Sequence, residues 1–210
     1  MSAAQDLMTT LRRTGLLAIV RGADREASVA TALALAEEGV QALEISLSGH
    51  EPLAVIEEVA ARTAGRVALG AGTVLTPGQV DDAVAAGARF VVTPALAGSV
   101  PHAVAAGLPV LCGALTPTEV ATAVGHGVTA VKIFPASTVG PGYLDALAGP
   151  FPALDTVPVG GIGKDQAVEY LAHGACAVGV AGPLCGDAPD GGDLAALRRR
   201  ARDFLRAVQP

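Results

Sequence analysis

Apolar and polar positions follow one pattern that recurs along the chain. An alanine-rich helical stretch ends in glycine, and a short run of β-branched and aliphatic residues follows at once. The glycines at these junctions are Gly39, Gly87, Gly107, Gly127 and Gly174. Glycine suits the end of a helix, because the chain there often takes a positive φ. The pattern therefore predicts alternating helices and strands.

Eight runs have the length and composition of buried strands. They cover residues 16–21, 40–45, 67–72, 88–93, 108–112, 128–134, 156–159 and 175–180. Helices are expected at 24–38, 51–63, 77–86, 98–106, 117–126, 141–148, 165–173 and 193–207, with an extra N-terminal helix at 3–13. Apolar strands that alternate with helices indicate a parallel sheet covered on both faces. Residues 187–193, after the eighth strand, are expected to form a turn-rich loop.

The alternation predicts an α/β fold. Eight units close most simply into a (β/α)8 TIM barrel, and a chain of 210 residues is long enough for one. An open doubly wound sheet is the alternative, but its GxGxxG fingerprint after the first strand is absent. No linker divides the chain, so residues 1–210 are expected to form a single TIM-barrel domain with an extra N-terminal helix.

Composition limits the kinds of molecule that the protein is expected to bind. Hydrophobic residues make up 51% of the chain and aromatic residues 3%, so small aliphatic side chains must fill the core. The net charge of −6 argues against a nucleic-acid partner. A solvated helix face is predicted for the arginines near the C-terminus, which are Arg198, Arg199, Arg200, Arg202 and Arg206. No apolar run reaches the roughly 18 residues of a membrane span and no signal peptide is recognisable, so a cytoplasmic protein without a membrane partner is expected.

Cysteine and histidine positions indicate neither a disulfide framework nor a metal site. Cys112, Cys176 and Cys185 are odd in number and lack CxxC spacing. Cys112 and Cys176 lie in apolar runs and are expected to behave as small hydrophobic residues. No two of the four histidines have HxH or HxxxH spacing, so neither a metal nor a cofactor is predicted.

Lysine is scarce, and its placement suggests chemistry. Only two of the 14 basic residues are lysines, and Lys132 lies in the run AVKIFP (130–135), which otherwise has the pattern of a buried strand. Burial disfavours an ammonium ion and lowers its pKa, which exposes a lone pair able to attack a carbonyl carbon and form a Schiff base. The alternative is a lysine that reaches water from the strand end or pairs with a carboxylate.

Further polar residues fall at the expected strand ends, where TIM barrels place their reactive groups. In chain order they are Arg21, Glu44, Ser46, Ser48, Thr73, Thr93 and Lys132, and Pro94 and the pair Gly160–Gly161 stand at similar positions. Glu44 is the one ionisable group in the run ALEISL (42–47), a second apolar strand. It can shuttle protons beside an amine, or it can form an ion pair with Lys132 or Arg21.

Gly160 and Gly161 follow the seventh strand, where many barrels bind phosphate. A plain tight turn explains a glycine pair equally well. The second lysine, Lys164, lies nearby and is expected to be solvated, with a role in anion binding as the alternative.

Five motifs, in order over nearly the whole chain, resemble one family. They are LEISL (43–47), GAGTVL (70–75), VTP (92–94), VKIFPA (131–136) and PVGGI (158–162). Together they resemble the class I aldolases for 2-keto-3-deoxy-6-phosphogluconate (KDPG) and 2-keto-3-deoxy-6-phosphogalactonate (KDPGal), which are grouped with 4-hydroxy-2-oxoglutarate (KHG) aldolase. The resemblance implies a TIM barrel, a homotrimer and cofactor-free, reversible cleavage of a 2-keto-3-deoxy sugar acid to pyruvate and an aldehyde such as glyceraldehyde 3-phosphate.

The resemblance also implies residue roles. Lys132 matches the lysine that forms the Schiff base, and Glu44 matches the general acid and base. Substrate contacts are implied for Arg21, Thr73, Pro94, Phe134, Gly160, Gly161 and Gly182.

The chain departs from the family pattern at two substrate-binding positions. Ser48 stands where the gluconate branch has arginine and the galactonate branch asparagine. Gly182–Pro183 stands where the family has a glycine–serine pair that helps to bind phosphate. Residues 132–143 resemble the galactonate branch and residues 149–151 the gluconate branch. The sugar acid and its phosphorylation therefore stay open, with KHG or a non-phosphorylated acid as alternatives.

Two other functions are compatible with parts of the pattern. One is a phosphosugar synthase or isomerase in which Lys132 is a fixed charge and forms no Schiff base. The other is a non-catalytic sugar-acid binding protein that kept the barrel, although intact Lys132 and Glu44 argue against it.

Overall fold

The computed structural model describes residues 2–208, so residues 1, 209 and 210 of the expected domain lie outside the described residues. Its strands are β1 (Leu16–Val20), β2 (Ala42–Ser46), β3 (Ala68–Gly72), β4 (Val91–Val92), β5 (Val110–Ala114), β6 (Ala130–Ile133), β7 (Thr156–Pro158) and β8 (Val178–Val180). Its helices are α1 (Ala3–Thr14), α2 (Arg25–Glu37), α3 (Pro52–Thr63), α4 (Pro77–Ala85), α5 (Ser99–Ala105), α6 (Pro117–Gly125), α7 (Gly142–Ala148), α8 (Lys164–Ala172), α9 (Gly182–Cys185) and α10 (Leu194–Val208), with 3-10 turns η1 (Ala136–Thr138) and η2 (Ala188–Asp190).

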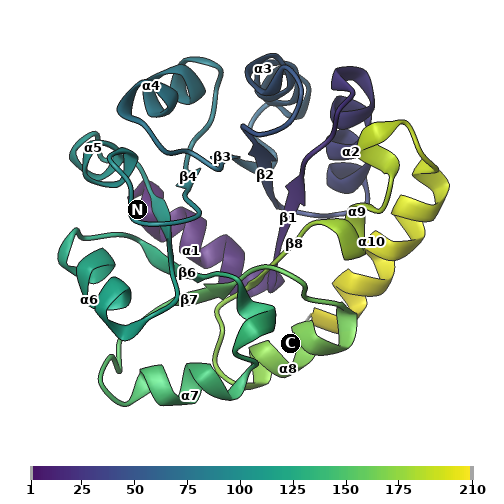
Figure 1. Ribbon diagram of the computed structural model, residues 1–210. Coiled ribbons are helices and arrows are strands. Elements are labelled where there is room, and N and C mark those ends of the chain that lie inside the picture. The colour runs from purple at the N-terminus through teal and green to yellow at the C-terminus, as the bar shows by residue number, and fades with distance from the viewer. Residues whose placement is uncertain (1, 209–210) are drawn as a thin grey trace.

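The strands form one closed parallel barrel inside a ring of helices (Figure 1). Their order in the sheet is β7-β6-β5-β4-β3-β2-β1-β8. A parallel bridge between Val159, just after β7, and Gly179 in β8 joins the two ends of this order. The predicted (β/α)8 barrel with its extra N-terminal helix is therefore confirmed.

Several strands begin later than the sequence predicts. Residues 88–93 were expected as a strand, but β4 has only two residues. The amide of Ala88, directly after Gly87, donates to the carbonyl of Ala83 in α4 at 2.9 Å, so this segment still belongs to the helix end. The amides of Val40, Leu108 and Ala175 bond back to the preceding helix in the same way. All five junction glycines have positive φ, as predicted.

The barrel interior and the outer layer are filled by alternate residues of each strand. Leu17 and Ile19 of β1 lie in the interior cluster, whereas Leu16, Ala18 and Val20 pack outward against the helices. Ala42 of β2 and Ala130 of β6 also belong to the interior. Because side chains alternate along a strand, the residues two positions on, which are Glu44 and Lys132, point into the barrel as well.

The extra helix α1 covers one end of the barrel. Its buried residues Leu7, Met8 and Leu11 pack into the interior cluster. Figure 1 shows α1 across the ring of strands. The strands' carboxyl ends and the loops that follow them surround the other end, where reactive groups are expected.

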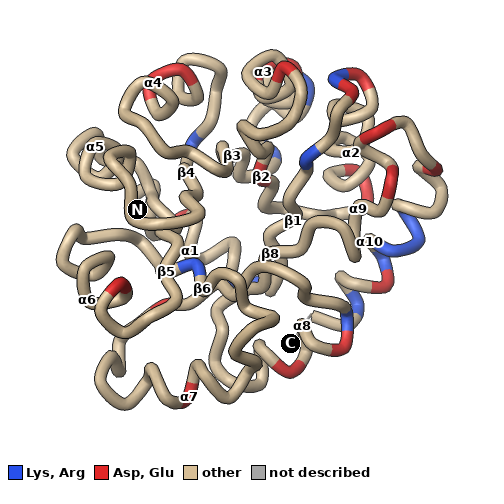
Figure 2. The backbone as a smooth tube through the Cα atoms, viewed as in Figure 1, with Lys and Arg blue, Asp and Glu red and all other residues tan. Residues whose placement is uncertain are grey.

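The C-terminal arginines do more than form the solvated face that was predicted. Figure 2 shows a row of basic residues along α10. Arg198 pairs with Glu37 at 2.5 Å, and Arg202 pairs with Glu38 at 2.8 Å. Arg200 donates to the carbonyls at the end of α9, at 2.8 and 2.7 Å. The prediction missed η1, α9 and η2, because three- and four-residue elements have no periodic signature.

Within residues 2–208, the structure has no helix that is both long and apolar enough to cross a membrane.

Candidate active site

Lys132 and Glu44 are both buried, on strands β6 and β2, which are four positions apart in the order of the strands around the barrel. Lys132 lies in β6, in register with Gly113 of β5, and its residue is only 5% exposed. Glu44 lies in β2, in register with Gly70 of β3, and is 1% exposed. Strands hold both side chains, so their positions are set by the barrel and not by mobile loops.

Burial makes the Lys132 amine easier to deprotonate. Desolvation lowers the pKa of Lys132, Glu44 opposes that shift, and the positive charge of Arg21 adds to it. Among the described residues, no carboxylate lies within the 4.0 Å of an ion pair with Lys132. The ammonium nitrogen lies 5.0 Å from the centre of the Phe134 ring, at cation–π distance. Lys132 therefore forms no ion pair with a carboxylate in the described part of the chain, which was one of the alternatives to a Schiff-base role.

Burial shifts Glu44 in the opposite direction. Desolvation raises the pKa of Glu44, and the attraction of Lys132 and Arg21 only partly offsets this effect. Its buried Oε2 has no hydrogen-bond partner among the described residues. A buried acceptor without a partner is costly, so a water or a substrate hydroxyl can bind there with a net gain. The carboxyl group lies over Gly72, where an added Cβ would overlap Oε1.

A cluster of hydroxyl groups joins the ends of the first three strands. The Ser46 hydroxyl lies 2.9 Å from Ser48 Oγ and 3.0 Å from Thr73 Oγ1. It also accepts a hydrogen bond from Nε of Arg21 at 3.3 Å. Thr73 has φ = 60°, which is an uncommon, strained conformation for a β-branched residue. The structure thus brings together two predicted substrate contacts, Arg21 and Thr73, through Ser46.

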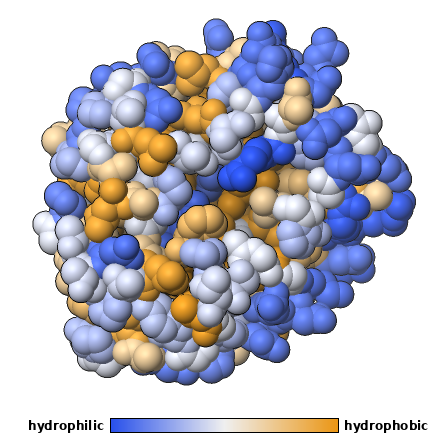
Figure 3. Space-filling model, in the orientation of Figure 1, coloured by the Kyte–Doolittle hydropathy of each residue, from blue (hydrophilic) through white to orange (hydrophobic). Residues whose placement is uncertain are grey.

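A cleft of about 520 Å³ opens beside this cluster. Its lining includes Arg21, Ser48, His50 and Asp190. Figure 3 shows hydrophilic and apolar side chains side by side around the centre of this face. The cluster is therefore within reach of a small polar molecule.

The loops after β6 and β7 form the other side of the site. The amide of Ser137 donates to the carbonyl of Gly160 at 3.1 Å, which ties the two loops together. Gly160 and Gly161 have φ of 103° and 73°. A Cβ on Gly160 would contact the Phe134 ring at 3.2 Å, and one on Gly161 would lie 2.9 Å from Cβ of Ser137. Glycine is therefore required here for both conformation and space.

Two other predicted contacts, Gly182 and Pro94, follow β8 and β4. Gly182 is the first residue of α9, and a Cβ there would meet nothing within 4 Å. Pro94 packs its backbone against Gly113 of β5, where an added Cβ would overlap the Pro94 carbonyl. Thr93 supports this contact, because its hydroxyl donates to the carbonyl of Ala95 at 2.8 Å and accepts from the amide of Gly113 at 3.2 Å.

The sequence analysis listed Ser46 among the polar residues at strand ends but gave it no specific role, and it did not single out Ser137. Ser46 lies two residues after Glu44 on the same strand and so faces the same way. Ser137 follows a strand end by four residues, and only the fold brings it to Gly161. Lys164 is exposed, as expected. Across residues 2–208, no group of three His, Cys, Asp or Glu side chains is arranged to hold a metal ion.

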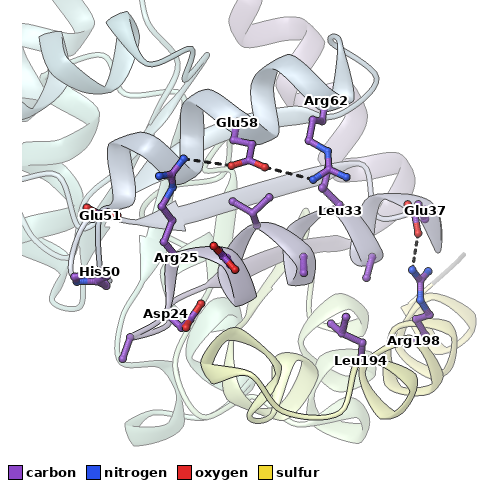
Figure 4. A pocket seen from close by; sticks show the side chains of 15 residues that line it. Asp24, Arg25, Leu33, Glu37, His50, Glu51, Glu58, Arg62, Leu194 and Arg198 are labelled. Atoms are coloured by element: carbon purple, nitrogen blue, oxygen red, sulfur yellow. Dashed lines mark hydrogen bonds and ion pairs between the residues drawn. The ribbon is translucent and has the colours of Figure 1, made fainter.

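A larger groove lies outside the barrel and has different chemistry. Its volume is about 810 Å³, and α2, α3 and α10 line it (Figure 4). Its arginines are already engaged: Glu58 pairs with Arg25 and Arg62, each at 3.4 Å, and Glu37 pairs with Arg198. Neither Lys132 nor Glu44 lines it. The groove therefore lacks the two buried ionisable residues found inside the barrel.

Comparisons with known proteins match the whole barrel. A family model described as KDPG and KHG aldolase matches residues 7–199. A 2-dehydro-3-deoxy-phosphogluconate aldolase from Treponema pallidum is 37% identical over 172 residues, which is 80% of each chain. A probable 2-dehydro-3-deoxy-6-phosphogalactonate aldolase from Rhizobium meliloti is 34% identical over 91% of this chain and 90% of its own length.

A solved structure adds a chemical observation. The KDPG aldolase from Legionella pneumophila superposes with a TM-score of 0.79 at 25% identity, over 96% of each chain. That structure holds pyruvate captured at low pH as a covalent carbinolamine intermediate.

Proposed function

The chain belongs to the KDPG and KHG aldolase family, and from this premise we propose that Lys132 is its Schiff-base nucleophile and Glu44 its proton-transfer group. The protein is an aldolase, which is a carbon–carbon lyase. One observation carries the proposal: two buried side chains face into the same barrel, and burial shifts the pKa of the amine down and that of the carboxyl group up. Such opposed shifts are typical of acid–base pairs in active sites.

The proposed reaction begins at the keto carbon of the substrate. The neutral Nζ of Lys132 attacks C2, and the resulting carbinolamine loses water to form a protonated imine. The imine is an electron sink. When the base removes the proton of the C4 hydroxyl, the C3–C4 bond breaks, the aldehyde leaves, and the bonding electrons form an enamine.

Glu44 is proposed to transfer protons both in the cleavage of the C3–C4 bond and in the later protonation of the enamine. As carboxylate it takes the C4 hydroxyl proton, directly or through a water, and as carboxylic acid it returns a proton to C3 of the enamine. Its raised pKa favours the carboxylic acid form, which can return that proton. Water then attacks C2 of the imine, which releases pyruvate and regenerates the free amine of Lys132.

The remaining predicted residues are proposed to hold the two ends of the substrate. Arg21 and Thr73 lie together and offer a cation and a hydroxyl to the C1 carboxylate. Phe134, Gly160 and Gly161 are proposed to line the path of the sugar chain, with Pro94 and Gly182 at its rim.

We propose a 2-keto-3-deoxy-6-phosphogluconate or 6-phosphogalactonate as the substrate. The relatives support both, since one is named for each acid. KHG and a non-phosphorylated acid are the second candidates, because Gly182–Pro183 provides no hydroxyl group. Cleavage rates for the gluconate, galactonate and KHG substrates, with and without phosphate, decide among them. An unchanged rate without phosphate would contradict a phosphorylated substrate.

We further propose that residues 1–210 act as one domain in a cytoplasmic homotrimer with no nucleic-acid or membrane partner. The family resemblance supports the trimer, and the net charge of −6 is consistent with a small-molecule partner only. Light scattering after size exclusion should give three times the chain mass of 20.7 kDa. A monomer with full activity would contradict the trimer.

Borohydride trapping tests the nucleophile. Reduction in the presence of pyruvate should add a three-carbon group to Lys132 and leave the exposed Lys164 unmodified, which makes Lys164 an internal control. Peptide mass spectrometry locates the adduct. A folded protein with no adduct would contradict the proposal and favour a phosphosugar synthase or isomerase, in which Lys132 is only a fixed charge.

Glu44→Gln separates proton transfer from imine formation. The amide keeps the shape of the side chain but cannot exchange the proton, so the pyruvate adduct should still form. Exchange of the C3 protons of pyruvate in deuterated water, followed by NMR, should slow about 100-fold or more. Wild-type exchange in this variant would assign proton transfer to another group.

A further inference from the structure

We propose that Ser46 is a positioning residue that prepares Arg21 and Thr73 to recognise the carboxylate of the substrate. The Ser46 side chain is buried, with 1% of the residue exposed, and it lies between these two partners at the end of β2. The inference rests on the proposed Schiff-base function and deepens it, because it concerns how the keto acid is held while Lys132 attacks.

The hydrogen-bonding capacity of one hydroxyl group sets the direction of the network. A serine hydroxyl has one proton to donate and two lone pairs that accept. Ser46 Oγ accepts from Nε of Arg21 at 3.3 Å and from the Ser48 amide at 3.4 Å. These two donors fill its lone pairs, so its own proton is left for one of the neighbouring hydroxyls.

Donation from Ser46 to Thr73 makes Thr73 a donor toward the substrate. The two oxygens are 3.0 Å apart. If Ser46 supplies the proton in that bond, the hydrogen of Thr73 points elsewhere and can bind an anionic oxygen. The strained φ of Thr73, 60°, shows that the backbone is held at this residue by its surroundings.

The bond to Arg21 fixes the plane of its guanidinium group. Ser46 engages Nε and leaves the two terminal nitrogens, which form no hydrogen bond to the described residues. A planar guanidinium group held at one nitrogen can present the others to a carboxylate in a defined direction. Arg21 is otherwise exposed, so without Ser46 it would sample many rotamers.

Ser48 makes this arrangement specific to the present chain. Its short hydroxyl lies 2.9 Å from Ser46 Oγ, and the cleft of about 520 Å³ opens beside it. Ser48 carries no charge, so Arg21 supplies the cation of this cluster. The proper orientation of Arg21 therefore matters more here than it would beside a second arginine.

The test compares two ketones that differ only in charge. Pyruvate carries the carboxylate, and pyruvamide replaces it with a neutral amide of nearly the same shape. For each protein, borohydride trapping gives the concentration at which half of the maximal Lys132 adduct forms. Thr63→Val serves as the matched control, because it also removes a buried hydroxyl, in α3 far from the cluster, where Thr63 bonds to the Val59 carbonyl at 2.7 Å.

Ser46→Ala should raise the half-trapping concentration of pyruvate about tenfold, equivalent to about 1.4 kcal/mol, and leave that of pyruvamide unchanged. Ser46→Thr keeps the hydroxyl and should keep the wild-type preference for pyruvate, and the Thr63→Val control should keep it too. If Ser46→Ala does not fold, Ser46→Cys gives the same comparison, because a thiol of similar shape is a weak hydrogen-bonding group.

The outcomes separate the two proposals. A wild-type protein that traps neither ketone overturns the Schiff-base function and this inference with it. In a second outcome, the wild-type protein traps pyruvate while Ser46→Ala leaves the ratio of the half-trapping concentrations of pyruvate and pyruvamide unchanged. That outcome overturns the role of Ser46 alone. An equal loss for both ketones would also overturn it, since a merely structural defect does not depend on the charge of the ligand.

Discussion

At the scale of single residues, the same burial has opposite effects on the two ionisable groups of the site. The free energy of a buried charge makes the ammonium form of Lys132 and the carboxylate form of Glu44 both unfavourable. A neutral amine is the form that attacks a ketone, and a carboxylic acid is the form that donates a proton. Desolvation therefore favours, in both groups, the form that the proposed mechanism requires, without any direct ion pair between them.

Replacement of Lys132 by arginine distinguishes a nucleophile from a fixed charge. Lys132→Arg keeps a positive charge on β6 but removes the amine, and we expect cleavage to fall more than about 1000-fold. A coupled assay for pyruvate release measures the rate, and Lys164→Arg is the control. Retention of a tenth or more of the wild-type rate in Lys132→Arg would show that charge is enough.

Gly72→Ala tests the space that Glu44 requires. A Cβ at residue 72 would overlap the Glu44 carboxyl group, so the side chain must move. We expect cleavage to drop about 100-fold, because a displacement of about 1 Å costs that much in positioned catalysis. Gly78→Ala is the matched control, since a Cβ there meets nothing within 4 Å. Equal activities of the two variants would mean that Glu44 relocates without consequence.

At the scale of elements, the regular units were predictable and the irregular ones were not. Each strand and each long helix repeats a pattern, so all eight strands could be found, and alternation along β2 and β6 placed Glu44 and Lys132 on the inner face. Several strands begin later than predicted, because the amide of the residue after the junction glycine donates a hydrogen bond to the preceding helix, as the amide of Ala88 does. The contact of Ser137 with Gly161 depends on how two loops meet, which no local pattern contains.

The short helix α9 illustrates such an irregular element. Four residues form too few internal hydrogen bonds to hold a helix, so its end depends on Arg200, which donates to the carbonyls of Leu184 and Cys185. Arg200→Ala should lower the free energy of unfolding by about 2 kcal/mol, the scale of hydrogen bonds from a charged group. Urea denaturation measures this value.

Arg199→Ala provides the comparison for that experiment. Arg199 is exposed and its nearest carboxylate, on Asp193, is 3.8 Å away, so its loss should change the unfolding free energy by less than about 0.5 kcal/mol. If both arginine variants lose the same stability, the carbonyl contacts of Arg200 are not the cause.

At the scale of the whole molecule, we expect the barrel to be more stable without the buried ionisable groups of Lys132 and Glu44. The hydrophobic cluster of the interior consists of aliphatic side chains with Met8 and Phe90, and α1 closes one end. Glu44 places an acceptor without a partner in this interior. Enzymes commonly accept such a loss of stability at the residues that react.

The loss of stability that the buried Glu44 carboxyl group causes should appear in the pH dependence of the free energy of unfolding. The folded-state pKa of Glu44 lies above its ordinary value of 4.5, so between those two values the folded protein binds more protons than the unfolded chain. Stability contributed by protonated Glu44 is therefore present at low pH and is lost as the pH rises through the folded pKa. Lys132 has the opposite sign: its lowered pKa means that stability is gained as the pH rises toward 10.5.

Glu44→Gln removes the first of these two effects and strengthens the second, because the Glu44 charge no longer opposes the lowering of the pKa of Lys132. The variant should be more stable than wild type at neutral pH, and the difference in unfolding free energy should grow as the pH rises above 4.5. Urea denaturation at successive pH values gives the difference, with Glu57→Gln on the exposed side of α3 as a control that should show no such trend. A difference that stays constant with pH would mean that the Glu44 carboxyl group is solvated, and the raised pKa that supports its proposed role in proton transfer would have no basis.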